Sequence, residues 1–309
     1  MKDKMSIADY FYSDENGDAH AEVYRVFPGI EVAYISVHMA DFDFGMFKKN
    51  SLKKYVSIHY CKEGRIEQEV EREFFYLMPG DCSIAIHDKS KKVFRLPLKH
   101  YHGISIGIDF SERQSPIIDF LESCGYVPTE ILNHICGVMS HTVFRSSESV
   151  KNFFDALYEV DEEQQLDYLR IKLPELFYRL KTSKNDSYAE VRSPVPRTQV
   201  DFVKKVALYI SENINQKITV KTLTQKFGVS DTYLQNAFRG VYDMPVISFI
   251  RAQKMQCAAR VLIRTNRTIE EIAEEFGYEN ESKFSAAFKR IMGDSPGVFR
   301  REHSKIKVL

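Results

Sequence analysis

The chain has 309 residues, of which 44% are hydrophobic and 13% aromatic, so a chain that is disordered throughout is excluded. At roughly 100–200 residues per domain, this length predicts two domains. The 43 basic and 43 acidic residues cancel only on average: up to Pro196 there are 24 basic and 31 acidic residues, and from Arg197 there are 19 basic and 12 acidic. A region of net charge −7 therefore precedes one of net charge +7, which favours a polyanionic partner for the second region.

Three features of the sequence predict a protein of the reducing cytoplasm. Acidic and polar residues, not an apolar run of about 7–15 residues, follow Met1–Met5, so no secretory signal is expected. No segment has about 18 consecutive apolar residues, the length that a membrane-spanning helix requires. The five cysteines are widely spaced and include no C-x-x-C pair, which is not typical of a zinc site or of a disulfide framework.

Residues 1–112 are predicted to form an antiparallel β domain. Apolar and polar side chains alternate between about residues 20 and 110, as at Ile104, Ile106 and Ile108, with the period of a half-buried strand. Turn signals such as Pro28-Gly29 and Pro79-Gly80-Asp81 separate the runs. Several short strands at this spacing predict a sandwich or a barrel.

Helices are predicted next, over residues 113–182, where apolar residues recur at helical spacing, for example at Val150, Phe153, Phe154 and Leu157. Residues 183–197 are polar and interrupted by prolines, which predicts a linker. The basic region then occupies residues 198–309.

The basic region contains one unit twice. Thr219, Leu223, Phe227 and Gly228 recur 49 residues later as Thr268, Ile272, Phe276 and Gly277. Such self-similarity indicates a duplicated supersecondary unit. In each copy a threonine can cap a helix, two apolar residues four positions apart give the helix a buried face, and a glycine supplies the left-handed residue that ends it.

A second helix is predicted in each copy, beginning near Ser230 or Asn280 and burying Leu234 and Phe238, or Phe284 and Phe288. This arrangement is a helix-turn-helix, whose second helix can lie in a DNA major groove. We predict the first unit at about 219–240, a connecting helix at about 245–264 and the second unit at about 268–292. One helix-turn-helix alone could be a protein-interaction module, but two copies with a connecting helix and a charge of +7 favour DNA.

Residues 198–303 resemble the DNA-binding domain of the AraC/XylS family of bacterial transcription regulators. The resemblance is carried by Arg251-Ala252-Gln253-Lys254-Met255, Ala258, Leu262, Thr268-Ile269, Ile272-Ala273, Phe276-Gly277-Tyr278, Phe284, Phe288-Lys289-Arg290, Gly293, Ser295-Pro296 and Phe299-Arg300-Arg301. The first copy departs from the family pattern at Thr224, where alanine is usual, and at Asp243, where glycine is common.

The resemblance implies which side chains contact DNA. The implied base-reading residues are Thr232, Gln235 and Asn236 in the first recognition helix, and Glu281, Ser282 and Lys283 in the second. Glutamine and asparagine amides can pair with adenine, and a threonine methyl group can meet that of thymine. Ala286 stands where a longer polar side chain is frequent, so the second helix is expected to read bases more weakly. Candidate phosphate contacts are Arg239, Arg251, Lys289 and Arg290, whose alternative role is a solvated surface.

For residues 1–182 the resemblance implies a cupin-like β-barrel that holds one small-molecule effector, followed by helices that form a homodimer. His100 and His102 lie at strand spacing with Ile104, which predicts that they point into the barrel. A structural role as hydrogen-bonded core or rim histidines is favoured, and the alternative is contact with the effector or with a metal. No metal site is predicted, because no third and fourth ligand stand at a recognisable spacing.

No G-x-S-x-G, phosphate-binding glycine loop or H-E-x-x-H pattern occurs, so neither a catalytic residue nor a cofactor is predicted. The sequence thus predicts a cytoplasmic transcription regulator, by family habit an activator, whose partners are double-stranded promoter DNA, RNA polymerase, an unknown effector and a second copy of itself. The alternative is a metal-binding cupin enzyme or metal sensor fused to a DNA-binding domain.

Overall fold

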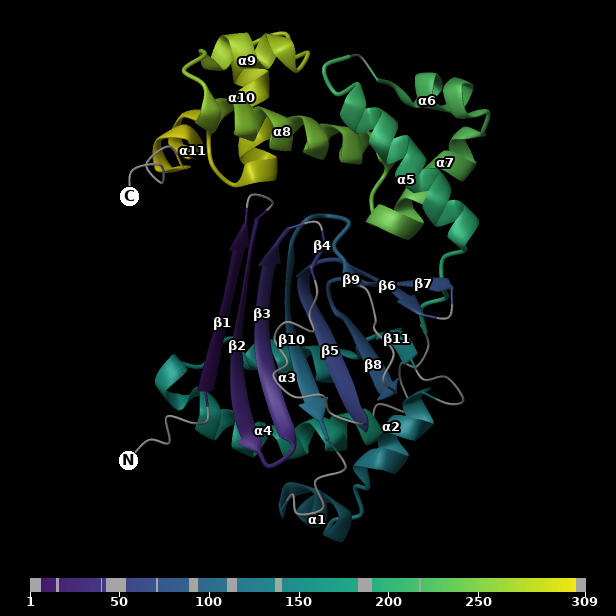
Figure 1. Cartoon of the computed structure of the whole chain (residues 1–309), viewed down its shortest axis with the longest axis vertical. Coiled ribbons are helices and arrows are strands. Elements are labelled where there is room, and N and C mark those ends of the chain that lie inside the picture. The colour runs from purple at the N-terminus through teal and green to yellow at the C-terminus, as the bar shows by residue number, and fades with distance from the viewer. Residues whose placement is uncertain are drawn as a thin grey trace. The chain divides into compact units, whose positions relative to one another are not determined.

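The computed structural model describes residues 7–14, 17–39, 41–42, 54–70, 72–88, 94–109, 116–136, 141–182, 191–216 and 218–303. The chain divides into two compact units, Met1–Pro196 and Arg197–Leu309 (Figure 1). Among the helices of the described ranges, none combines the length and the apolar character that crossing a membrane requires.

The first unit is built on two antiparallel sheets. The larger sheet has seven strands in the order β1-β2-β3-β10-β5-β8-β11: β1 (Ile7–Asp14), β2 (Gly17–Phe27), β3 (Ile30–His38), β10 (Tyr101–Ile108), β5 (Lys54–Gly64), β8 (Asp81–Asp88) and β11 (His141–Arg145). The smaller sheet has four strands in the order β4-β9-β6-β7: β4 (Asp41–Phe42), β9 (Phe94–Arg95), β6 (Ile66–Val70) and β7 (Glu73–Leu77). The strand pairing of the described residues does not close the two sheets into one barrel.

Strand register gives each face of the larger sheet its own core. Ile106 pairs with Val32 of β3 and with Ile58 of β5, and Ile58 pairs with Ile84 of β8, so a row of apolar side chains crosses four strands. This row packs against helices. The opposite face, which includes Val37, packs with residues of the smaller sheet. The alternation read from the sequence therefore separates two cores, because successive strand residues point to opposite faces.

Among its described residues, the first unit also has four helices: α1 (Pro116–Ser123), α2 (Pro128–Cys136), α3 (Glu148–Ala156) and α4 (Glu162–Thr182). In Figure 1, α3 and α4 lie behind the larger sheet. The ring of Phe154 on α3 stacks on Tyr60 of β5, with ring centroids 4.5 Å apart. Leu169, Leu173 and Phe177 of α4 belong to the same core. The helices thus cover one face of the sheet.

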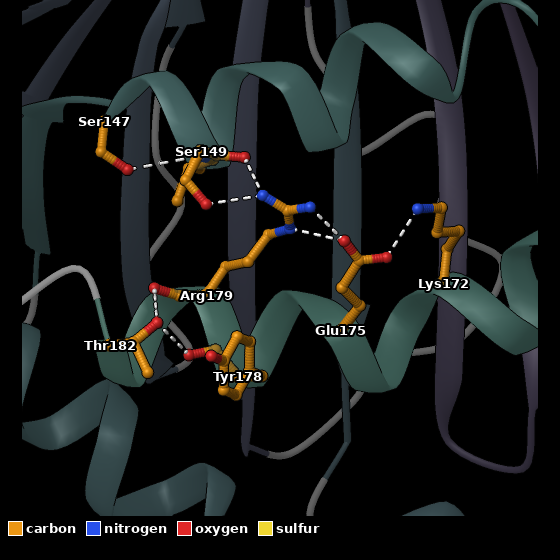
Figure 2. Close-up of polar contacts among 8 residues, drawn as sticks. Ser147, Ser149, Lys172, Glu175, Tyr178, Arg179 and Thr182 are labelled. Carbon is orange, nitrogen blue, oxygen red and sulfur yellow. Dashed lines mark hydrogen bonds and ion pairs between the residues drawn. The ribbon is translucent and has the colours of Figure 1, made fainter.

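A polar network joins α3 to α4 (Figure 2). Arg179 of α4 donates to the backbone oxygen of Ser149 at 2.8 Å and pairs with Glu175, and Lys172 binds the second oxygen of Glu175 at 2.6 Å. Burial by itself would raise the pKa of Glu175, but the hydrogen bonds from Lys172 and Arg179 hold it below its ordinary value. The charged carboxylate therefore helps fix the helix pair.

Residues 191–196, at the end of the predicted linker, pair with strands of the first unit. Val191 forms a bridge with Phe144 of β11, and Val195 forms one with Phe74 of β7. The first helix of the second unit, α5 (Arg197–Glu212), starts immediately afterwards.

The second unit is all helical. After α5 come α6 (Val220–Phe227), α7 (Asp231–Tyr242), α8 (Val246–Arg264), α9 (Ile269–Glu275), α10 (Glu281–Met292) and α11 (Pro296–His303). Phe238 of α7 packs on Phe249 of α8 with ring centroids 5.4 Å apart, and Phe288 of α10 packs on Phe299 of α11 at the same distance. Each predicted aromatic anchor therefore joins its recognition helix to a neighbouring helix.

Candidate nucleic-acid interface

The first helix-turn-helix consists of α6 and α7. The Thr219 side chain accepts a hydrogen bond from the Thr222 amide, and the Thr222 side chain accepts one from Thr219, which forms a capping box at the start of α6. Gly228 ends α6 in the left-handed conformation with φ 65°, and Ser230 caps α7. These caps lie where the sequence predicts them. They fix the angle of the turn, and so the direction in which α7 presents its polar side.

The predicted readers on α7 do not all have the same surroundings. Thr232 and Asn236 are exposed, and so is Arg239 one turn further along. Gln235 is half-buried: its Oε1 accepts from the Val246 backbone N–H at 3.3 Å, and its Nε2 donates to Asp231 Oδ1 at 3.2 Å. Both the oxygen and the nitrogen of this amide therefore bond within the protein. No local sequence pattern predicts the bond to Val246, which lies 11 residues further along the chain.

The second helix-turn-helix consists of α9 and α10. Thr268 and Glu271 form a capping box, Gly277 follows α9 with φ 77°, and Asn280 caps α10. Glu281, Ser282 and Lys283 are exposed in the first turn of α10. Lys283 forms an ion pair with Glu279, so part of its charge is already neutralised.

The connecting helix α8 is held near both of its ends. Pro245 provides no side-chain cap at its start, and the Gln235 amide oxygen takes up the Val246 N–H instead. Lys254 donates to the Phe276 backbone oxygen at 2.9 Å, where α9 ends, and burial lowers the pKa of this ammonium. Arg300 of α11 donates to the Leu262 backbone oxygen at 3.1 Å. These bonds tie α8 to α7, α9 and α11.

Two of the predicted phosphate contacts act electrostatically on the same phenol. Burial raises the pKa of Tyr278, and the charges of Arg251 on α8 and Arg290 on α10 oppose that rise. Arg251, Lys289 and Arg290 are all exposed. Arg239 lies in the last turn of α7. The cations thus belong to both units of the duplicated domain.

The two histidines proposed to contact an effector, His100 and His102, lie just before β10 and within it. Ile104, Ile106 and Ile108 face the helices and not the smaller sheet, and His102 lies on that same side, opposite Ser36 of β3. His102 therefore does not point into a space between the two sheets. Its Nε2 lies 2.9 Å from His38 Nε2, and His38 Nδ1 lies 2.9 Å from Asp18 Oδ1. Burial and the neighbouring His38 lower the pKa of His102.

His100 lies just before β10, with its Nδ1 3.2 Å from the Leu98 backbone oxygen. In the part of the chain that the structure describes, no three His, Cys, Asp or Glu side chains are grouped so as to hold a metal ion.

Comparison with known proteins finds one family model and relatives that share the second unit. Residues 223–302 match a family model described as a helix-turn-helix domain. The chain is 32% identical over 99 residues to the regulatory protein SoxS of Escherichia coli (strain K12), a match that covers 32% of this chain and 92% of SoxS. It is 34% identical over 99 residues to the F1 operon positive regulatory protein of Yersinia pestis, and this match spans 33% of that longer relative.

Among solved structures, the C-terminal domain of AraT, a response regulator from Geobacillus stearothermophilus, has 33% sequence identity and a TM-score of 0.31, covering 32% of this chain and 84% of that one.

Proposed function

The chain belongs to the AraC family of DNA-binding transcription regulators, and from this premise we propose that each protomer reads two successive major grooves of promoter DNA. In this proposal α7 enters one groove and α10 the next. The observation that carries it is the pair of exposed polar helix faces joined through one connecting helix that hydrogen bonds fix at each end.

The length of α8 suits this task. Its 19 residues span about 28 Å at 1.5 Å per residue. Successive major grooves on one face of B-form DNA lie roughly 34 Å apart. Both recognition helices pack on α8, and the proposal requires α8 to hold them about one DNA turn apart.

The proposal assigns base reading to exposed side chains. Thr232 and Asn236 are the base readers of the first unit, and an asparagine amide can pair bidentately with adenine. Glu281, Ser282 and Lys283 are the candidates in the second unit. Arg239, Arg251, Lys289 and Arg290 neutralise phosphates, so binding weakens steeply as salt concentration rises.

Selection of DNA from a random library, followed by footprinting with the full chain, tests this function. We expect two protected patches on one face of the duplex, about one helical turn apart. Lys205→Ala is a suitable control, because Lys205 is an exposed cation on α5 and belongs to neither recognition helix. One protected patch, or two on opposite faces of the duplex, would contradict the two-groove proposal.

We propose that the first unit is a sensor. It binds a small-molecule effector in a cupin-like fold, forms a homodimer through its helices, and changes how the DNA-binding units meet the promoter and RNA polymerase. Activation is favoured, since one relative is named a positive regulatory protein. Mass spectrometry of small molecules that co-purify with the full chain is the direct test, and purified protein that carries none and responds to none would contradict a sensing role.

A further inference from the structure

The turn at the start of β8 has an unusual environment. Met78-Pro79-Gly80-Asp81 forms a type II turn, with the Asp81 amide donating to the Met78 oxygen at 2.8 Å and Gly80 at φ 80°. Asp81 is completely buried, and its carboxylate lies within salt-bridge distance of two arginines, Arg145 and Arg192. A buried carboxylate needs such partners, because leaving it unpaired in a low dielectric is costly.

Arg192 comes from residues 191–196, which we call the linker strap. Its Nε donates to Asp81 Oδ2 at 3.2 Å and its Nη2 to Asp81 Oδ1 at 3.1 Å. This is a bidentate guanidinium–carboxylate pair, which fixes orientation as well as supplying attraction. Arg192 is itself largely buried, with 24% of its side chain exposed, so solvent screens the pair less than it would on an open surface.

The strap also pairs through its backbone. The Arg192 amide donates to the Val143 oxygen at 2.8 Å, and the Val195 amide donates to the Phe74 oxygen at 2.7 Å. Val143 belongs to β11, the last strand of the larger sheet, and Phe74 to β7, the last strand of the smaller one. The strap therefore bridges the edges of both sheets, which an edge strand with unpaired groups readily permits.

The sequence of the strap favours this extended docking. Ser193 and Val195 each precede a proline, and a residue in that position is restricted to extended conformations. Pro194 and Pro196 have no backbone N–H to donate, so Val195 supplies the single N–H of the Pro-Val-Pro segment. Because the free strap is already restricted, its docking costs less conformational entropy than that of an ordinary polar linker.

We propose that the Asp81 turn is an intramolecular docking site for the linker strap, and that docking and release of the strap set the freedom of the DNA-binding unit. With the strap docked, Pro196 is the one residue between the paired Val195 and helix α5. Released, the six residues from Val191 to Pro196 add up to about 20 Å of reach. This inference rests on the proposed function for its consequence at DNA, but the docking itself does not.

Hydrogen exchange on the full chain without DNA tests the docking. Arg192→Met removes the ion pair and keeps the aliphatic stem, so we expect the Val195 amide to exchange at least roughly tenfold faster. Amides of β10 should keep their native rates within about twofold. Arg145→Met is the matched control, because Arg145 binds the same carboxylate but lies outside the strap. It should leave Val195 within about threefold of native.

Several outcomes would overturn the proposal. One is a native Val195 that exchanges at the rate of an unprotected amide, and another is an unchanged rate in Arg192→Met. Equal acceleration by both variants would mean that a loosened turn, and not Arg192, controls the strap. If Arg192→Met does not fold, Arg192→Lys is the second variant, because lysine keeps the charge but cannot donate two parallel hydrogen bonds. An intermediate acceleration of exchange at Val195 is expected in this variant. Native exchange rates in it would also overturn the docking role.

A second measurement tests the freedom of the DNA-binding unit. Nitrogen-15 relaxation of residues in that unit should report a shorter rotational correlation time in Arg192→Met than in the native chain, with no change in Arg145→Met. Identical correlation times would overturn the tether role. Failure to bind any DNA would instead refute the proposed function and leave the exchange result standing, so the two failures are distinguishable.

Discussion

In the first helix-turn-helix, Thr219 caps α6 and Phe238 anchors α7, and in the second, Thr268 caps α9 and Phe288 anchors α10. The surfaces on this shared frame differ. Residues 219–243 carry three basic and two acidic side chains, whereas residues 268–293 carry three basic and six acidic ones. Because negative charge repels phosphate, we expect the two copies to contribute unequally to DNA binding, although they share one frame.

The largest expected effect is on stability, and it comes from the buried aromatic ring that each helix-turn-helix has. Phe238→Ala and Phe288→Ala each remove a fully buried ring, and each should lower the free energy of unfolding by about 3–5 kcal/mol. Urea unfolding of the full chain, followed by circular dichroism, measures this loss. Leu208→Ala is the control, since Leu208 is 58% exposed and its loss should cost less than about 0.5 kcal/mol. A large cost in only one copy would show that the frames are not equivalent.

Base reading should separate the two copies. Asn236→Ala is expected to weaken binding to the selected DNA by about 1–3 kcal/mol, because it removes a bidentate amide. Glu281→Ala should weaken binding by less than about 0.5 kcal/mol, or strengthen it, since its carboxylate lies on the phosphate-facing helix. Fluorescence anisotropy at one fixed salt concentration measures both. Equal losses in the two variants would remove the proposed division of labour.

The caps should again behave alike. Thr219→Ala and Thr268→Ala each remove the side-chain oxygen that accepts from the first turn of a helix, at an expected cost of about 1 kcal/mol in the free energy of unfolding. Thermal unfolding measures the change. The Thr→Ser variants retain the oxygen and should stay close to native, so a serine variant as unstable as the alanine one would argue against capping as the cause.

Gln235 distinguishes a positioning role from a reading role. Because its amide binds Val246 N–H and Asp231, Gln235→Ala should lower stability by about 1 kcal/mol and weaken binding to all DNA sequences to a similar degree. Competition binding with single-base variants of the selected site measures base preference. A specific loss at one base pair would instead mean that the amide leaves Val246 and reads DNA.

The smallest expected effect concerns the ends of the recognition helices. Asp243 ends α7 at φ 57°, a left-handed conformation that costs energy for a residue with a Cβ atom, whereas Gly293 follows α10 at φ 90°. Asp243→Gly should therefore stabilise the protein by about 0.5–1 kcal/mol. In Gly293→Ala a Cβ atom meets nothing within 4 Å, so any loss reports backbone strain alone. Thermal unfolding of the pair checks both signs.

Local chemistry made much of the DNA-binding unit predictable. A threonine cap, a left-handed glycine and apolar residues four positions apart act within one or two helical turns, so Thr219, Gly228 and Ser230 could be assigned their places from the sequence. Packing between elements that are far apart in the sequence was harder to predict. The alternation of Ile104 with polar residues predicted a half-buried strand, but not that this face meets helices while the other face meets a second sheet.

The two charge regions, the duplicated helix-turn-helix frame and the proline-interrupted linker could be predicted from the sequence, because each depends on residues close together in the chain. Tertiary structure decided which way His102 points, that Gln235 binds the start of α8, and that Arg192 reaches Asp81. The physical reason is that a side-chain contact depends on which partner the fold brings within about 3 Å, and Arg192 and Asp81 are 111 positions apart in the sequence.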